Sequence, residues 1–402
     1  MQSPTAVSEL ISVLTKLEQG DFASRWETAK QIPDFGEPAI TFLVDLLQNN
    51  ADDPELQWFV ARILGEFNHA DAVMALTQLL QEADDDDVAE IAAQMLAQIG
   101  PQSIDALATL LESSPARGLV VSALSQMQDA VIVPILIKAV ADEDASVRLQ
   151  VIETLGRFHD PQIIPVLLQG LADLSAQVRQ VAIASISYRA HLFYEHDHDP
   201  VALIQPFLTD VDVQVCQGAA LALGRLGTDT AAQALRMTAS ADNIPAPFKL
   251  TIIQALGQIG NDQSVRFLQK LWPHTTSALQ VIDDENLTLA EAIIKALTLH
   301  RQPELQGVST QALIYCLHHH PGADLTLNKT IASALGQLGD TTAIPELIRL
   351  LGIADMGVRL HAIAALKQIS SELAYTKLQA LAEDDTVEKD VRDGVAIALQ
   401  EW

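Results

Sequence analysis

Apolar residues recur in a fixed register along almost the whole chain. An apolar anchor is followed eight residues later by Leu or Ile, and positions four and five after the anchor are almost always small or aliphatic. On a helical wheel these positions form one stripe, so each segment is predicted to be an amphipathic helix. After a weak first pair, Ser24/Ile32, the register holds Leu56/Leu64, Val88/Leu96, Ala116/Leu124, Val147/Leu155, Val178/Ile186, Val215/Leu223, Phe248/Leu256, Leu289/Leu297, Leu327/Leu335, Val358/Leu366 and Val391/Leu399.

A turn and a second apolar segment follow each of these helices. The first helix ends at a glycine or a polar turn, as at Gly227 and Gly339. The second segment often carries proline in its first turn, at Pro134, Pro165 and Pro345. Three positions before their anchors, four polar residues are predicted N-caps: Asp144, Ser175, Asp212 and Asp355. Such units bury their stripes only by stacking, which predicts an all-α, right-handed α-solenoid of about eleven helix pairs over residues 1–402.

Three segments depart from the regular repeat. Residues 1–20 hold an apolar pattern outside the register and are predicted to form an N-terminal capping helix. Residues 187–200 are predicted to be an inserted loop between helices, because the closing residues Ile186 and Leu223 lie 37 positions apart. A second irregular insertion is expected at 273–286.

The repeat resembles HEAT repeats. More narrowly, it is similar to the HEAT-like repeats of phycobilisome lyases, a cyanobacterial type. Their form D-x-x-V-R…A…A-L-G-x-x-G-D…A-I-P-x-L-x-x-L-L is met closely at 144–171 and 327–351. The resemblance covers nearly the whole chain and specifies the fold more strongly than the function, because such repeats serve as scaffolds, chromophore lyases and a few metalloenzymes.

The residue after the anchor is basic in seven of the twelve units. In HEAT-like arrays this residue commonly pairs with turn aspartates of a neighbouring unit, which implies a structural role here. The seven residues are Arg25, Arg117, Arg148, Arg179, Lys249, Arg359 and Arg392. At Cys216 a thiol replaces the basic residue. This cysteine is either a small, partly buried side chain or a reactive thiol beside the 187–200 loop.

Composition and charge narrow the environment and the partners. The net charge is −28 over 402 residues, and such a surface repels phosphate backbones, so no nucleic acid is expected as a partner. The acidity either steers basic partners or keeps a long helical protein soluble. There are two cysteines without a C-x-x-C motif, no signal-peptide pattern and no apolar run of membrane-spanning length. These features favour a cytoplasmic protein with no membrane contact.

The stretch "HLFYEHDHDP" within the predicted loop is rich in metal-ligand residue types. His191, Glu195, His196, Asp197, His198 and Asp199 suit a borderline divalent ion such as zinc, iron or manganese. The alternative is a solvated turn that ends at Pro200, because adjacent loop residues rarely all point inward.

Paired tryptophans give the strongest indication of a recognition surface. Trp26 and Trp58 both lie two positions after the anchor in consecutive units, off the core stripe. Equivalent positions of stacked repeats lie side by side, so the two indoles could form one exposed patch, extended by Phe59, that binds a partner. The alternative is that the N-terminal helix folds over them.

These features favour a non-catalytic scaffold that holds another protein along the concave surface of the solenoid. The resemblance implies two partner classes, a phycobiliprotein or an A-type iron–sulfur carrier protein, in phycobilisome or iron–sulfur cluster assembly. It also implies an enzymatic alternative, a phycobilin lyase or lyase-like subunit that attaches or detaches a bilin chromophore. A metal-binding HEAT protein using residues 191–199 is a further alternative. Deoxyhypusine hydroxylase looks like a stack of such repeats with iron-binding His-Glu pairs, but this chain contains no His-Glu dipeptide. The scaffold needs no cofactor, whereas the alternatives imply a bilin or a divalent metal.

Overall fold

The computed structural model describes residues 4–241, 244–272, 284–299, 303–319, 324–384 and 386–402. Every regular element in these ranges is a helix. The chain divides into two compact units, Met1–Ser185 and Ile186–Trp402. Helix α12 (Ala176–Tyr188) crosses the boundary between them.

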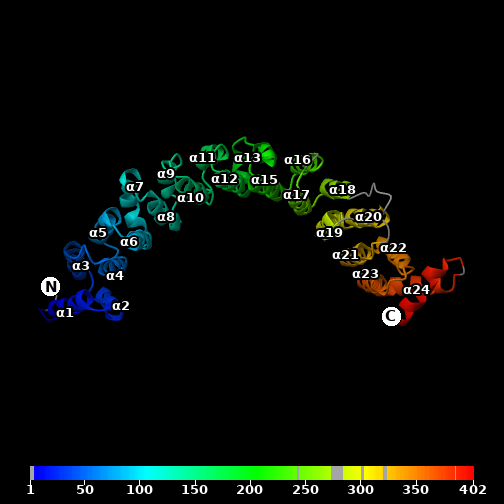
Figure 1. Ribbon diagram of the computed structural model, residues 1–402, viewed down its shortest axis with the longest axis horizontal. Coiled ribbons are helices and arrows are strands. Elements are labelled where there is room, and N and C mark those ends of the chain that lie inside the picture. Colours follow the sequence, from blue (N-terminus) through cyan, green and yellow to red (C-terminus); the bar gives the residue numbers. More distant parts are fainter. Residues whose placement is uncertain (1–3, 242–243, 273–283, 300–302, 320–323, 385) are drawn as a thin grey trace. The chain divides into compact units, whose positions relative to one another are not determined.

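Unit 1 stacks its helices in two layers (Figure 1). It begins with α1 (Pro4–Gln19), which packs against α2, α3 and the short helix η1 (Ile32–Phe35). The helices that carry the anchors form the first-helix layer: α2 (Phe22–Ala29), α4 (Pro54–Leu64), α6 (Asp86–Ile99), α8 (Arg117–Gln126) and α10 (Ala145–Leu155). The second layer holds α3 (Pro38–Asn49), α5 (Ala70–Glu82), α7 (Ile104–Ser113), which follows η2 (Gly100–Ser103), α9 (Ile132–Ile137) and α11 (Ile163–Leu171).

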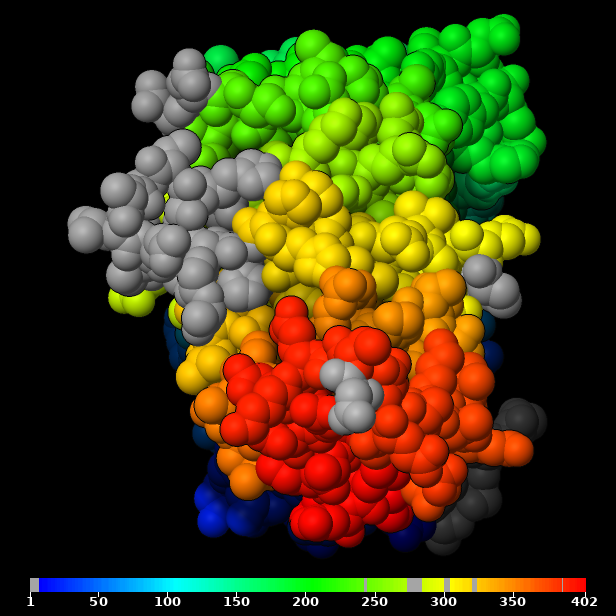
Figure 2. All heavy atoms as spheres, turned by 90° about the vertical axis from the view of Figure 1, so that its right-hand side faces the viewer, coloured from blue at the N-terminus to red at the C-terminus, as the bar shows by residue number. Residues whose placement is uncertain are grey.

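Unit 2 repeats this arrangement with longer helices in its first-helix layer. Its first-helix layer consists of α15 (Val213–Leu226), α17 (Ala246–Ile259), α19 (Asp284–Thr298), α21 (Leu325–Leu338) and the first half of α23 (Met356–Ala382). The remaining elements are α13 (Ala190–Glu195), α14 (Pro200–Ile204), η3 (Gln205–Thr209), α16 (Asp229–Ala239), α18 (Asp262–Lys270), α20 (Pro303–His319), η4 (Thr341–Ala343), α22 (Ile344–Leu350) and α24 (Lys389–Gln400). Seen in space-filling form, the yellow to red helices of this unit make one closely packed surface (Figure 2).

The predicted register lies in the core. In eight of the twelve pairs both the anchor and the closing residue are buried, so the stripe does face the second layer. Three of the four predicted N-caps are confirmed. The carboxylates of Asp144, Asp212 and Asp355 accept backbone N–H groups at the starts of α10, α15 and α23. At the other end, Gly227 and Gly339 adopt left-handed conformations with φ of 68° and 74°, which allow the chain to leave the helix.

A glycine after the closing residue sets how closely the first helices approach one another. A Cβ atom placed on Gly336 of α21 would lie 2.8 Å from the Cα atom of Ala365 on α23. The same close approach occurs between Gly224 of α15 and Ala255 of α17, at 3.0 Å. The Ala-Leu-Gly sequence therefore serves packing, because only glycine leaves room for the neighbouring backbone.

The all-α solenoid prediction is confirmed, and the described ranges contain eleven first helices from α2 to α23, followed by α24, which carries the last anchor, Val391. Helix α23 contains both helices of one repeat, because Ser370 has a non-helical conformation (φ −166°, ψ 101°) that divides it into two halves. The prediction of a loop over residues 187–200 is only partly right, because residues 190–195 form the short helix α13. Its Leu192 and Phe193 are buried, so the insertion supplies its own apolar contacts. Of the predicted insertion at 273–286, residues 273–283 lie outside the described residues.

Candidate protein-binding surface

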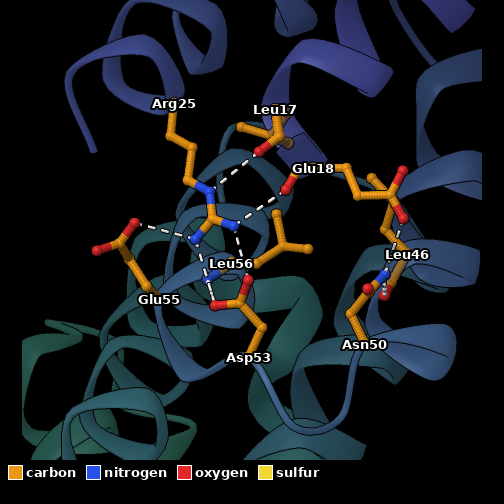
Figure 3. A network of polar contacts seen from close by, with 8 residues as sticks. All are labelled: Leu17, Glu18, Arg25, Leu46, Asn50, Asp53, Glu55 and Leu56. Atoms are coloured by element: carbon orange, nitrogen blue, oxygen red, sulfur yellow. Dashed lines mark hydrogen bonds and ion pairs between the residues drawn. The ribbon is translucent and has the colours of Figure 1, made fainter. Parts of the chain in front are cut away.

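Arg25 joins three helices at the start of unit 1. Its side chain is only 8% exposed. Nε donates to the carbonyl of Leu17 at 3.1 Å and Nη2 to that of Glu18 at 3.0 Å, both near the C-terminus of α1 (Figure 3). The guanidinium also pairs with Asp53 at 2.6 Å and Glu55 at 3.0 Å, at the start of α4. One buried cation thus ties the first helix to the second repeat.

In the Arg25–Asp53 ion pair, each partner stabilises the charged form of the other. The hydrogen bond from Arg25 lowers the pKa of the Asp53 carboxyl, and the backbone N–H of Leu56, which Asp53 caps, lowers it further. The same hydrogen bond raises the pKa of Arg25. Both groups are therefore held in their charged forms across the neutral range.

The predicted pairing of post-anchor arginines with turn aspartates is confirmed at three repeats. Besides Arg25, Arg117 pairs with Asp142, and Arg148 pairs with Asp173 at 2.7 Å. In two other repeats the arginine donates to turn carbonyls: Arg179 to Asp173 and Leu174, and Arg359 to Leu351. These arginines hold successive repeats together, and their role is structural.

Aromatic side chains gather on the exposed side of α2 and α4. Trp26 and Trp58 both keep intermediate exposure, so α1 does not bury them. The guanidinium carbon of Arg62 lies 4.9 Å from the ring centroid of Trp26 and 5.7 Å from that of Trp58. Phe22, which is 55% exposed, stacks on Trp26 with ring centroids 6.2 Å apart. Phe22, Trp26, Trp58 and Arg62 form what we call the aromatic patch.

The prediction that Phe59 extends this patch is wrong. Phe59 is completely buried, with Phe22, Trp26 and Trp58 packed against its ring. It lies three positions after its anchor, about 60° away on the helix wheel, and therefore on the core side. Sequence reasoning also missed Phe22 and Arg62. The available signal was helical spacing, because Phe22 lies four residues before Trp26, and Arg62 four residues after Trp58.

A groove borders the aromatic patch between α4 and α6. Its volume is about 520 Å³, and Phe22 and Trp58 contribute aromatic rings to its wall. The rest of the wall mixes apolar and amide side chains with four carboxylates, from Glu55 on α4 and from Asp85, Asp87 and Glu90 at the start of α6. The stacking thus places an aromatic surface and an acidic surface around one hollow.

The candidate metal ligands of residues 191–199 do not come together around one point. His191 lies 3.1 Å from Glu195 on the surface, and His196, just after α13, has its Nδ1 hydrogen-bonded to the carbonyl of Leu192 in that helix. Asp199 accepts the N–H of Val201 and caps α14. Asp197 occupies the turn with φ 60°, and the ring of His198 packs against Phe193. Among the residues that the structure describes, no three or more His, Cys, Asp or Glu side chains are arranged to hold a metal ion.

Both cysteines are free and buried. The thiol of Cys216 donates to the carbonyl of Asp210 at 3.2 Å. Burial raises the pKa of the Cys216 thiol, as does the nearby Asp210 carboxylate, so the thiol is protonated at neutral pH. Burial raises the pKa of Cys316 to about 12. Neither environment produces the thiolate that a nucleophilic cysteine needs.

Comparison with known proteins identifies the repeat. Models of HEAT repeats match residues 40–125, 113–187, 164–246 and 310–400, well over half of the chain. The chain belongs to the HEAT-repeat family. No curated protein matches this sequence. Within the described ranges, no helix has both the length and the apolar character needed to cross a membrane.

Solved structures support the same HEAT-repeat architecture. Kap121p aligns with 99% of this chain at 14% identity and a TM-score of 0.59, and importin beta with 97% at 13% identity and a TM-score of 0.53. The chain spans 49% of the Kap121p structure and 60% of the importin beta structure. Human deoxyhypusine hydroxylase aligns with 66% of this chain and 95% of its own, at 22% identity and a TM-score of 0.28. At these identities the first two likenesses show the solenoid fold.

Proposed function

We propose that the protein is a non-catalytic scaffold that binds another protein on its repeat surface, with the aromatic patch of unit 1 as an anchor. The observation that carries this proposal is the exposure of Phe22 beside two half-buried indoles that flank Arg62. Aromatic residues and arginine are the side chains that dominate binding energies in protein interfaces. A patch that spans two stacked repeats offers a rigid surface, because its residues sit on packed helices.

The absence of activated groups at the candidate residues supports a binding role over a catalytic one. Cys216 is a buried, protonated thiol, His191 pairs with Glu195, and His196 and Asp199 bond to nearby backbone groups. Arg25, Arg117 and Arg148 are held in ion pairs between repeats. The chemistry visible in these side chains stabilises the stack.

Two partner classes follow from the similarity to phycobilisome-lyase repeats: a phycobiliprotein and an A-type iron–sulfur carrier. Both rest on the repeat pattern at 144–171 and 327–351 alone. A bilin lyase is the alternative function from the same similarity. Copurification with bilin absorbance supports the lyase, and colourless capture of an iron–sulfur carrier supports the adaptor.

A capture experiment with matched variants tests the scaffold. Phe22→Ala removes an exposed ring from the patch, whereas Met74→Ala removes a comparably exposed apolar side chain from α5. Partner retention from native cell extract should fall at least about tenfold for Phe22→Ala, as for an interface anchor, and stay near wild type for Met74→Ala. Both variants should melt close to wild type. Equal retention by all three proteins contradicts the patch as an anchor.

A further inference from the structure

The groove beside the aromatic patch has an unusual charge environment. Residues 31–116 contain sixteen Asp and Glu side chains but only one Lys or Arg, Arg62. Four of these carboxylates line the groove: Glu55, Asp85, Asp87 and Glu90. The electrostatic potential of the hollow is therefore strongly negative, which attracts cations and repels anions.

Two of the four carboxylates are already engaged within the protein. Glu55 pairs with Arg25 at 3.0 Å, and Asp85 accepts the N–H groups of Asp87 and Val88 as the N-cap of α6. In the part of the chain that the structure describes, the carboxylates of Asp87 and Glu90 have no basic partner. These two groups are free to bind a cation from outside.

Cations already lie on the aromatic surface, among them the ammonium of Lys30, 5.7 Å from the ring centroid of Trp26. The guanidinium of Arg62 lies over both Trp26 and Trp58, at 4.9 and 5.7 Å from their ring centroids. A planar guanidinium stacks on aromatic rings and bonds carboxylates with two parallel N–H groups, whereas an ammonium does neither as well. Phe22 and Trp58 offer rings to the groove, and Asp87 and Glu90 offer carboxylates.

We propose that this groove binds an arginine-bearing, basic peptide segment of the partner protein. The inference rests on the proposed scaffold function and specifies the chemistry that its surface recognises. An incoming guanidinium stacks against Phe22 and Trp58 while its N–H groups donate to Asp87 and Glu90. Charge disfavours the other occupants: a second copy of this chain carries −28, and a nucleic acid is an anion as well.

Peptide binding to the full chain tests the proposal. The probe is a fluorescently labelled nine-residue peptide with three arginines separated by glycine and serine, measured by anisotropy at low salt. The comparison peptide replaces each arginine with citrulline, which keeps the shape and removes the charge. We expect the arginine peptide to bind at least about tenfold more tightly, and its affinity to fall as salt is added.

Matched variants separate the groove from general acidity. Asp87→Asn with Glu90→Gln removes two charges from the groove, and Asp45→Asn with Asp105→Asn removes two exposed charges from the second layer of the same unit. The first pair should weaken arginine-peptide binding by about tenfold, and the second by less than about twofold. Equal weakening by both pairs, or equal binding of the citrulline peptide, overturns the proposal. Circular dichroism melting checks that each variant is folded.

The same variants distinguish failure of this inference from failure of the scaffold function. If native extract yields a partner that the Asp87/Glu90 variant retains as well as wild type, the scaffold stands and the groove inference fails. If wild type retains no partner while the arginine peptide still binds the groove, the scaffold function fails. If the groove variant loses both the peptide and the partner, both are supported.

Discussion

Replacing Arg25 by methionine should loosen the N-terminal end of unit 1. Methionine keeps most of the apolar stem of the side chain but removes the guanidinium. The carbonyls of Leu17 and Glu18 then lose their donor, and Asp53 loses its cation. The helix that depends on these bonds is α1, whose C-terminal carbonyls have no partner within the helix itself.

The magnitude follows from the exposure of each partner. A hydrogen bond to a charged group contributes about 1.5–3 kcal/mol when it is buried. The bond to Leu17 is buried, but the side chains of Asp53 and Glu55 are 38% and 49% exposed, so water replaces much of what they lose. We expect the free energy for local opening of α1, in which it detaches from α2, to fall by about 2–4 kcal/mol. Since about 1.4 kcal/mol corresponds to a factor of ten, this is about 30- to 1,000-fold in the opening equilibrium.

Hydrogen exchange is the suitable assay, because repeats contact only their neighbours and unfold locally. Amides of α1 should lose protection in Arg25→Met, while those of α15 in unit 2 stay unchanged. Lys30→Met is the control, since Lys30 is 56% exposed and pairs with Glu27 on the surface. Its effect should stay within about 0.5 kcal/mol. Equal loss in the two variants, or loss spread evenly over both units, would refute this account of Arg25.

Three further outcomes are expected. Leu335→Ala should cost about 2–5 kcal/mol in denaturant unfolding because Leu335 is fully buried, whereas exposed Gln337→Ala on the same helix should stay within about 0.5 kcal/mol; similar losses would refute the register. The hydrogen bond from Arg148 lowers the pKa of Asp173, so its contribution to stability is present above the unfolded pKa near 4 and is lost as pH falls through the lower folded value. Asp173→Asn should therefore destabilise at pH 7 and reduce the acid dependence of unfolding, and an unchanged pH profile counts against the pair. Cys216 should react with a thiol reagent at pH 7.5 far more slowly in native than in urea-unfolded protein, and rapid native labelling would restore the reactive-thiol hypothesis.

The repeat could be predicted from sequence because its signal is periodic and each unit repeats it. Val147 and Leu155 lie eight residues apart and both are buried, as predicted. The resemblance to HEAT-like arrays also implied the arginine–aspartate pairs, whose basic residue recurs at the same position in successive units. Local helical geometry and nearest-neighbour stacking determine these features.

The details of the surface could not be predicted in the same way. Phe59 was predicted to lie in an exposed patch. On the helical wheel it is only about 60° from the anchor Leu56, so it lies on the core side and is buried. The partnership of Arg62 with both indoles depends on how α2 and α4 pack against each other in three dimensions. Residues 190–195 form a helix because Leu192 and Phe193 pack inward, and the density of histidine and aspartate there drew attention to metal binding instead.

Photo-crosslinking at Phe22 tests the central claim most directly. A photoreactive amino acid replaces Phe22 in one preparation and Met74 in another, and each full-length protein is irradiated in the cells that produce it. Both positions are more than half exposed and lie in unit 1, so they differ in surface and not in accessibility. The account predicts a discrete adduct with a second protein from position 22 and none from position 74. Adducts from both positions in equal yield, or from position 74 alone, would contradict the aromatic patch as the site where the scaffold holds its partner.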